Sequence, residues 1–215
     1  MGKLKILLTG FLPFGGNTIN PSQLIVESLE YSHPCVELHK VILPVSFLQS
    51  KKQVEELMEV LRPDAVISIG QSGGRGEINI ERIAVNLNDA VKPDNDGDIP
   101  FERKIYEDGA NAYFATVPVK KIVQNIKDAG IPAALSNSAG LYVCNNVMYT
   151  VLHNVAARHI PVVAGFIHVP YLPQQTALMD KKPSMNLQDM IAAVRIAIDT
   201  VVCELSSLKP NFPIV

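Results

Sequence analysis

The feature of this sequence that most constrains its fold is a series of short apolar runs. Lys5–Thr9 and Ala65–Ile69 each stop at a glycine, and Val162–Ile167 stops at His168. Runs of this length that do not alternate with polar residues are typical of strands buried on both faces of a parallel sheet. We therefore predict that all three runs are strands of one central sheet.

Helix-start signals lie between these runs. The stretch Asn20–Gln23 offers a capping Asn, a Pro at the first helical position and a Gln three residues after the cap, and it predicts a helix to about Leu29. Ser46 likewise predicts the start of a helix to about Leu61. The remaining predicted elements are strands at 36–43 and 133–135, and helices at 118–129, from Cys144 onward, and at 186–208. This alternation predicts a single three-layer α/β/α domain, residues 1–215, with a mostly parallel central sheet.

Three stretches interrupt the alternation. The glycine-rich segment Gly70–Gly76 leads into Ile78–Leu87, whose composition predicts extended chain, such as a hairpin, instead of a helix. Residues 90–107 are rich in Pro, Asp, Asn and Gly and predict a long loop, and 171–185 predict a second irregular segment. Loops of this length in a compact domain are more often functional than not.

Composition excludes several classes of protein. With 215 residues, 47% of them apolar, and a formal net charge of -2, the chain fits one soluble globular domain and not a partner of nucleic acid or of anionic membranes. Three cysteines without a C-x-x-C pair indicate neither a disulfide framework nor structural zinc. No signal sequence or membrane span is evident. We expect a cytoplasmic protein in a reducing compartment, without cofactor or metal.

Cys144 is the first candidate for chemistry, because it lies at a predicted helix start. Apolar residues recur at helical spacing after it, at 147, 148, 151, 152 and 155. The free N–H groups of a first helical turn and the positive end of the helix dipole favour a thiolate over a thiol, which activates a nucleophile. The alternative is a small buried residue that packs the helix on the sheet.

His168 and Glu81 are the other two candidates. His168 follows a buried strand, and ligands bind beyond the carboxyl ends of strands in such sheets, so it is placed to act as base for a thiol. Glu81 shares parity with Ile83, Val85 and Leu87, which predicts a carboxylate on the apolar side and hence a charged partner. An imidazolium is one such partner, and the adjacent Arg82 is the alternative. The histidines at 33, 39, 153 and 159 fit structural roles better.

The residues support a metal site or a phosphate-binding loop less well. Cys144 and the histidines at 153, 159 and 168 lack the close paired spacing of a metal site. Gly70–Gly76 follows a strand as a phosphate loop does, but it lacks the Gly-Lys-Ser/Thr ending and no helix follows it.

The motifs as a set resemble those of the pyroglutamyl peptidases, also called pyrrolidone-carboxylate peptidases. The resemblance spans almost the whole chain and rests on Gly10–Gly15, Asn20–Ser22, Gly70–Arg75, Glu81–Asn86, Pro93–Asn95, Ser136–Gly140, Val143–Asn145 and Gly165–Pro170. It implies a cysteine nucleophile, a histidine base and a glutamate that orients the histidine, at Cys144, His168 and Glu81. It also implies a homotetramer.

The implied reaction is removal of an N-terminal pyroglutamate from peptides. The terminal group is a flat, uncharged lactam, which an aromatic sandwich of Phe11 and Phe14 would hold, with amides such as Asn20 and Gln71 bonding its polar atoms. Val143, beside the nucleophile, is expected to contact the substrate as well. Backbone N–H groups near Cys144 would face the developing oxyanion.

Two positions depart from the family pattern. Relatives carry an arginine where this chain has Val91, and a threonine where it has Leu141. The missing arginine predicts a slow member of the family, and Lys92 is expected to point the other way in extended chain. The alternative functions are a phosphorylase-like α/β enzyme with phosphate in the glycine loops, or a catalytically weakened small-molecule-binding relative.

Overall fold

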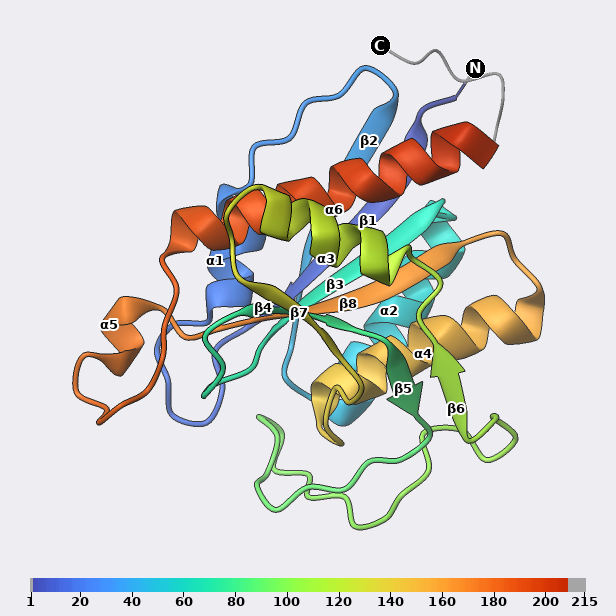
Figure 1. Cartoon of the computed structure of the whole chain (residues 1–215). Helices are drawn as coiled ribbons and strands as arrows, with labels where there is room; N and C mark the ends of the chain where they lie inside the picture. Colours follow the sequence, from blue (N-terminus) through green and yellow to red (C-terminus); the bar gives the residue numbers. More distant parts are fainter. Residues whose placement is uncertain (1, 209–215) are drawn as a thin grey trace.

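The computed structural model describes residues 2–208 and has a six-stranded central sheet (Figure 1). Its strand order is β2-β1-β3-β8-β4-β7. Neighbouring strands are parallel except that β4 and β8 pair antiparallel, so β4 and β7 run against the other four. The strands are β1 (Leu4–Phe11), β2 (Val36–Leu43), β3 (Ala65–Gln71), β4 (Ile78–Glu81), β7 (Ala133–Ser136) and β8 (Val163–Val169). The mostly parallel sheet that the sequence predicts is confirmed.

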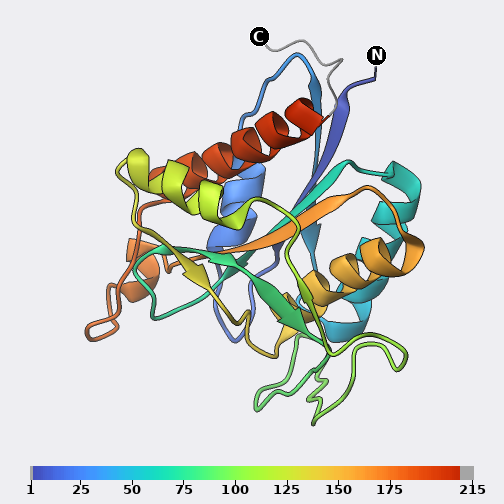
Figure 2. The same cartoon turned by 45° about the vertical axis from the view of Figure 1, so that its right-hand side comes forward.

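Helices cover both faces of this sheet, as Figures 1 and 2 show. On one face lie α1 (Pro21–Ser28), α3 (Val119–Asp128) and α6 (Leu187–Leu208). On the other face α2 (Phe47–Leu61) packs against α4 (Val143–Arg158). Caps explain two of the starts: Asn20 Oδ1 accepts from the N–H of Ser22, and Ser46 Oγ accepts from the N–H of Gln49.

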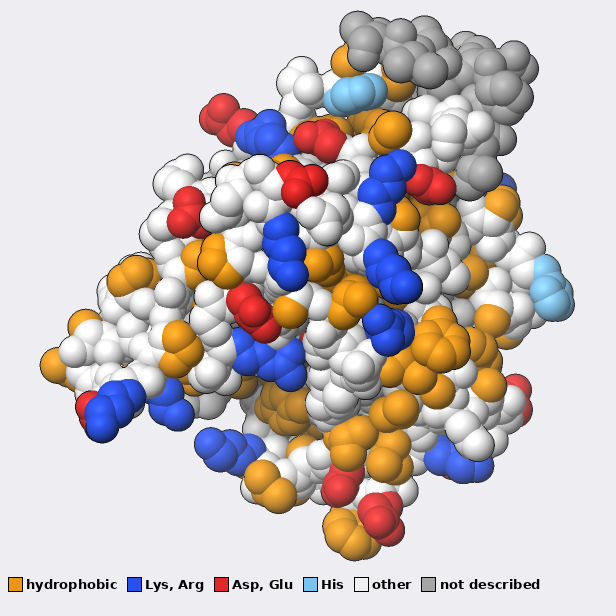
Figure 3. Space-filling view, in the orientation of Figure 1, with side chains coloured by type: hydrophobic (Ala, Val, Ile, Leu, Met, Phe, Trp, Pro, Cys, Tyr) orange, Lys and Arg blue, Asp and Glu red, His pale blue; other side chains and the backbone are white. Residues whose placement is uncertain are grey.

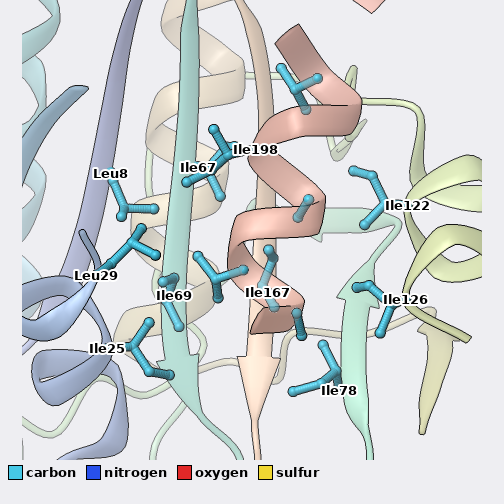
Figure 4. Close-up of a cluster of buried hydrophobic side chains, with 14 of the residues drawn as sticks. Leu8, Ile25, Leu29, Ile67, Ile69, Ile78, Ile122, Ile126, Ile167 and Ile198 are labelled. Atoms are coloured by element: carbon cyan, nitrogen blue, oxygen red, sulfur yellow. The ribbon is translucent and has the colours of Figure 1, made fainter. Parts of the chain in front are cut away.

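The two faces carry separate apolar cores. Figure 4 shows the core under α6, where Ile67, Ile69 and Ile167 of the sheet meet Ile198 of α6 and Ile122 of α3. The other core lies under α2 and α4 and contains the alternate strand residues, because successive strand side chains point to opposite faces. A polar side chain on the α4 face of a strand end therefore points toward the start of α4.

The stretch 78–87 differs from the predicted continuous extension. It divides at Arg82 into β4 of the main sheet and β5 (Ile83–Val85), which pairs antiparallel with β6 (Ala112–Phe114) in a separate two-stranded sheet. The parity argument for Glu81 is therefore wrong beyond that break, where Ala84 is buried and its neighbours only half-buried. Glu81 is buried for another reason: β4 lies between β8 and β7, inside the sheet.

Three smaller differences concern segment ends. His168 lies inside β8 and does not terminate it, because its backbone still pairs with Gly70 and Asn79. The segment 171–185 contains a short helix, α5 (Pro173–Thr176), and β6 follows the long loop.

Within residues 2–208, no helix is both long enough and apolar enough to span a bilayer.

Candidate active site

The nucleophile candidate Cys144 is the second residue of α4. Tyr142 is the N-cap, and its carbonyl already accepts from the N–H of Asn146, so the helix begins directly beside the thiol. The N–H groups of Val143, Cys144 and Asn145 belong to the first turn and have no carbonyl four residues earlier within the helix. They give this end of α4 a positive partial charge at the sulfur.

Gly70, at the carboxyl end of β3, leaves room for the sulfur. A Cβ at this position would lie 2.8 Å from Cys144 Sγ and 2.9 Å from the ring of Phe166. Real Cβ atoms do not approach other atoms so closely, so a side chain here would displace the thiol. The glycine that ends the predicted strand is thus required by the close approach of α4 to the sheet.

The register of β8 and β4 brings His168 and Glu81 together. Asn79 pairs with His168, and Glu81 pairs with Phe166, which lies two residues earlier in β8. Paired strand residues share a face, and so do residues two apart, so all four point to the α4 side. There His168 Nδ1 lies 2.7 Å from Glu81 Oε1, and the imidazole also hydrogen-bonds with Cys144.

The surroundings of His168 favour its charged form. Burial is the largest influence and lowers the pKa of His168, but the hydrogen bonds to Cys144 and Glu81 and the negative charges of both groups raise it, to about 9 in all. Because Nδ1 faces the carboxylate, Nε2 is left for the thiol. A thiolate beside an imidazolium is the reactive state of a cysteine nucleophile.

The partner of Glu81 is His168, as predicted from burial, and not the adjacent Arg82. Glu81 is 0% exposed, and its second ion-pair neighbour is Arg75, whose Nη1 lies 3.9 Å from Oε1. The same Nη1 donates to Asn79 Oδ1 and to Ser136 Oγ. Arg75 thus places a second positive charge near the same carboxylate oxygen that faces the imidazole.

A pocket of about 360 Å³ lies beside the first turn of α4. Phe14 and Tyr142 contribute aromatic rings to it, with centroids 6.2 Å apart, and Gln71 contributes an amide. The full lining is Phe14, Gly15, Asn17, Gln71, Asp89, Ala90, Val91, Lys92, Pro93, Leu141, Tyr142 and Tyr171. A larger hollow of about 480 Å³ lies at the opposite end of the sheet, around 58–64 and 158–162. Neither lining includes the three catalytic candidates, but only the pocket of 360 Å³ includes Tyr142, the N-cap of α4.

Three predicted substrate residues do not line this pocket. Phe11 is 3% exposed and packs against Phe166 in the core, and Val143 is buried in the same core. Asn20 uses its amide within the protein: Oδ1 accepts from Ser22, and Nδ2 donates to the carbonyl of Leu12. The amide of Asn20 caps α1, so its hydrogen-bonding atoms are already used within the protein and do not face a ligand.

Sequence reasoning missed Tyr142 and Tyr171 as pocket residues. Tyr142 directly precedes α4 and Tyr171 follows β8 by two residues, so their places at the ends of elements were an available signal. Lys92 was expected to point away from the site, but it lines the pocket together with Val91, because the loop is not extended there.

One α/β domain that brings a thiol, an imidazole and a carboxylate together at the start of a helix has the arrangement of a cysteine-type hydrolase. The pyroglutamyl peptidase family model matches residues 4–204. The chain belongs to the pyroglutamyl peptidase family, whose members are cysteine-type hydrolases. Among residues 2–208, no three His, Cys, Asp or Glu side chains are grouped to hold a metal ion.

The chain aligns with similar proteins over nearly its full length and nearly all of theirs. The pyrrolidone-carboxylate peptidase of Thermosipho africanus is 46% identical over 94% of this chain and 98% of its own, and that of Clostridium perfringens is 42% identical over 96% and 97%. The crystal structure of Bacillus amyloliquefaciens pyroglutamyl peptidase I superposes with a TM-score of 0.89 at 40% identity, covering 94% of this chain and 98% of that one. A mutant pyrrolidone carboxyl peptidase from Pyrococcus furiosus gives 0.90 at 42% identity, over 94% and 100%.

Proposed function

We propose that this chain removes an N-terminal pyroglutamyl residue from peptides, with Cys144 as nucleophile, His168 as acid and base, and Glu81 as the group that orients His168. The observation that carries the proposal is the chain of contacts from the thiol to the imidazole and on to the carboxylate, 2.7 Å away. The family of the chain supports the substrate class.

The reaction follows in two steps. The sulfur of Cys144 attacks the carbonyl carbon that follows the lactam ring, and His168 gives its proton to the leaving amine as the C–N bond breaks. Water then adds to the thioester with His168 as base, the C–S bond breaks, and pyroglutamate leaves. The first-turn N–H groups of α4 would stabilise the negative oxygen in both steps.

The pocket suits a neutral ring. The rings of Phe14 and Tyr142 supply apolar area, and Gln71 supplies hydrogen-bonding atoms for the lactam. We assign ring contact to these three residues. A substrate role for Phe11, Asn20 and Val143 would require the site to differ from the arrangement described above.

The test is release of a reporter amine from a pyroglutamyl amide, with and without a thiol alkylator. Cys144→Ser should lower turnover by at least about a thousandfold while the fold is retained, because a serine hydroxyl lacks the acidity of a thiol. Cys35→Ser and Cys203→Ser are matched controls and should stay within a few-fold, since both residues lie away from α4's first turn. Substantial hydrolysis by Cys144→Ser would remove Cys144 as nucleophile.

The same assay separates the alternatives. A phosphorylase-like enzyme would need inorganic phosphate for turnover, and a weakened binding relative would bind pyroglutamate without releasing amine. We also propose a cytoplasmic location, which three free cysteines support.

A further inference from the structure

The segment Tyr171–Met185 leaves the end of β8 directly after the catalytic histidine and carries α5, which projects from the layered body (Figure 1). Its base is closed, because the N–H of Met185 donates to the carbonyl of Tyr171 at 2.9 Å. The base also packs against the turn that follows β3: a Cβ at Gly73 would lie 2.1 Å from the Tyr171 ring. The segment is therefore held in place beside the pocket.

Gln175 of α5 makes hydrogen bonds at both ends of its amide. Its Oε1 accepts from the backbone N–H of Leu172 at 2.9 Å, and a backbone N–H can only donate. Its Nε2 donates to Gln71 Oε1 at 2.9 Å and to the carbonyl of Ile19 at 3.4 Å. Two backbone groups of opposite character thus determine which way round the Gln175 amide lies.

The polarity of Gln71 follows from that of Gln175. Since Gln175 presents an N–H to Gln71, Gln71 must turn its own oxygen toward α5. Its Nε2 then remains as the end of the amide whose donors have no partner within residues 2–208, in a residue that lines the pocket. A lactam ring differs from the ring of an N-terminal proline in its uncharged amide nitrogen and in one carbonyl oxygen, which accepts hydrogen bonds and does not donate them.

We propose that Gln175 is a positioning residue that makes Gln71 a hydrogen-bond donor to the lactam carbonyl, so that the pair distinguishes 5-oxoproline from proline. The inference rests on the proposed function, and it adds the group that selects the ring. A site built to bond a particular oxygen discriminates strongly against a ligand that lacks it, because its own polar group is then left without a partner.

The test is Gln175→Glu. The carboxylate keeps an acceptor for Leu172 but turns an acceptor toward Gln71, so the Gln71 amide reverses and presents its oxygen to the pocket. We expect KM for a pyroglutamyl reporter amide to rise about tenfold with kcat within about threefold. Gln174→Glu places the same charge on the neighbouring exposed residue, and its KM should match that of the parent.

A double-mutant cycle supplies the second readout. In a Gln71→Ala background, Gln175→Glu should change KM by less than about twofold, because the group through which it acts is gone. An unchanged KM in the single variant, or an equal rise in both backgrounds, would overturn the proposal.

Ring binding can also be measured without turnover. Protection of Cys144 from iodoacetamide by 2-pyrrolidone, relative to pyrrolidine, should fall in Gln175→Glu and persist in Gln174→Glu. If the parent protein releases no amine, the proposed function fails. The protection ratio still decides the role of Gln175: a ratio equal in both variants contradicts it.

Discussion

His168 on β8 stabilises the buried carboxylate of Glu81 on β4. Glu81 is a carboxylate with no exposed surface, and removal of its partner would leave a buried charge, which costs several kcal/mol. The imidazolium offsets that cost because it lies 2.7 Å away in the same low-dielectric region. The geometry that serves catalysis is thus also the geometry that makes burial of the carboxylate tolerable.

The raised pKa of His168, about 9, predicts a pH dependence with a definite sign. The protonated form contributes stability that is fully present below the ordinary value of 6.5 and is lost as the pH rises through about 9. The free energy of unfolding should therefore fall over that window, by an amount on the order of 3 kcal/mol. Urea unfolding at pH 6.5 and 9.5 measures it, and Glu81→Gln should reduce the fall.

The same group shapes the rate profile. We expect kcat/KM to decline above about pH 9, where the imidazolium proton of His168 needed by the leaving amine is lost. A profile that is flat from acid to alkaline pH would contradict the pair.

Val91, where the family resemblance predicts an arginine, is 96% exposed at the pocket. A charge added there is screened by water, and Lys92 and Arg75 already supply positive charges at the pocket and at Glu81. Val91→Arg should raise kcat/KM on pyroglutamyl amides by about threefold to tenfold, less than a buried charge would. Lys92→Ala should lower it.

The measurement is the rate of Cys144 alkylation against pH, together with turnover, for the parent and Val91→Arg. Equal alkylation profiles and equal turnover would show that the missing arginine is irrelevant in this protein.

At the scale of elements, buried asparagines pair with backbone groups of the irregular segments. Asn145, next to the nucleophile, accepts from the N–H of Val85 and donates to the carbonyls of Val85 and Leu87, at 2.9 to 3.0 Å. Asn86 does the same for the loop at Ile105 and Tyr106. Because buried backbone groups must be paired, these side-chain amides supply the hydrogen bonds that a neighbouring strand would otherwise make.

Asn145→Ala should destabilise the protein by roughly 2–4 kcal/mol, since it removes three hydrogen bonds to the backbone of Val85 and Leu87. Turnover should fall as well, because β5 leads to the loop that forms one wall of the pocket. Urea denaturation measures the first effect and the reporter assay the second.

Gln124→Ala on α3 is the control, because its amide makes an exposed contact with Asp128. Its stability should change by no more than about 0.5 kcal/mol. A loss in Asn145→Ala no larger than that of the control would show that the three hydrogen bonds are not needed.

At the scale of the whole molecule, apolar side chains gather on the surface that carries β5, β6 and the loop between them (Figure 3). Phe101 is 82% exposed and Phe114 66% exposed. Exposed large apolar side chains of this kind are typical of interfaces.

We propose a homotetramer, the state that the family resemblance implies. Light scattering after size exclusion should give a mass four times that of the 23.5 kDa chain. Phe101→Asp should lower the mass if this surface is part of an interface. A parent mass of 23.5 kDa at micromolar concentration would contradict the tetramer.

The sequence by itself determined the order of the main strands and helices and the identity of Cys144, His168 and Glu81 as candidates. These follow from local signals: buried strands have apolar runs, helix starts have caps, and strand ends carry the polar groups. Such signals act over a few residues, so one chain is sufficient to read them.

The tertiary structure decided which candidates meet. The break at Arg82, the position of β4 between β8 and β7, and the core packing of Phe11 depend on contacts between distant segments. The polarity of Gln71 depends on Gln175, which is 104 residues away in the chain. Periodicity can show that a residue is buried, but only the register of neighbouring strands and the approach of loops determine what it is buried against.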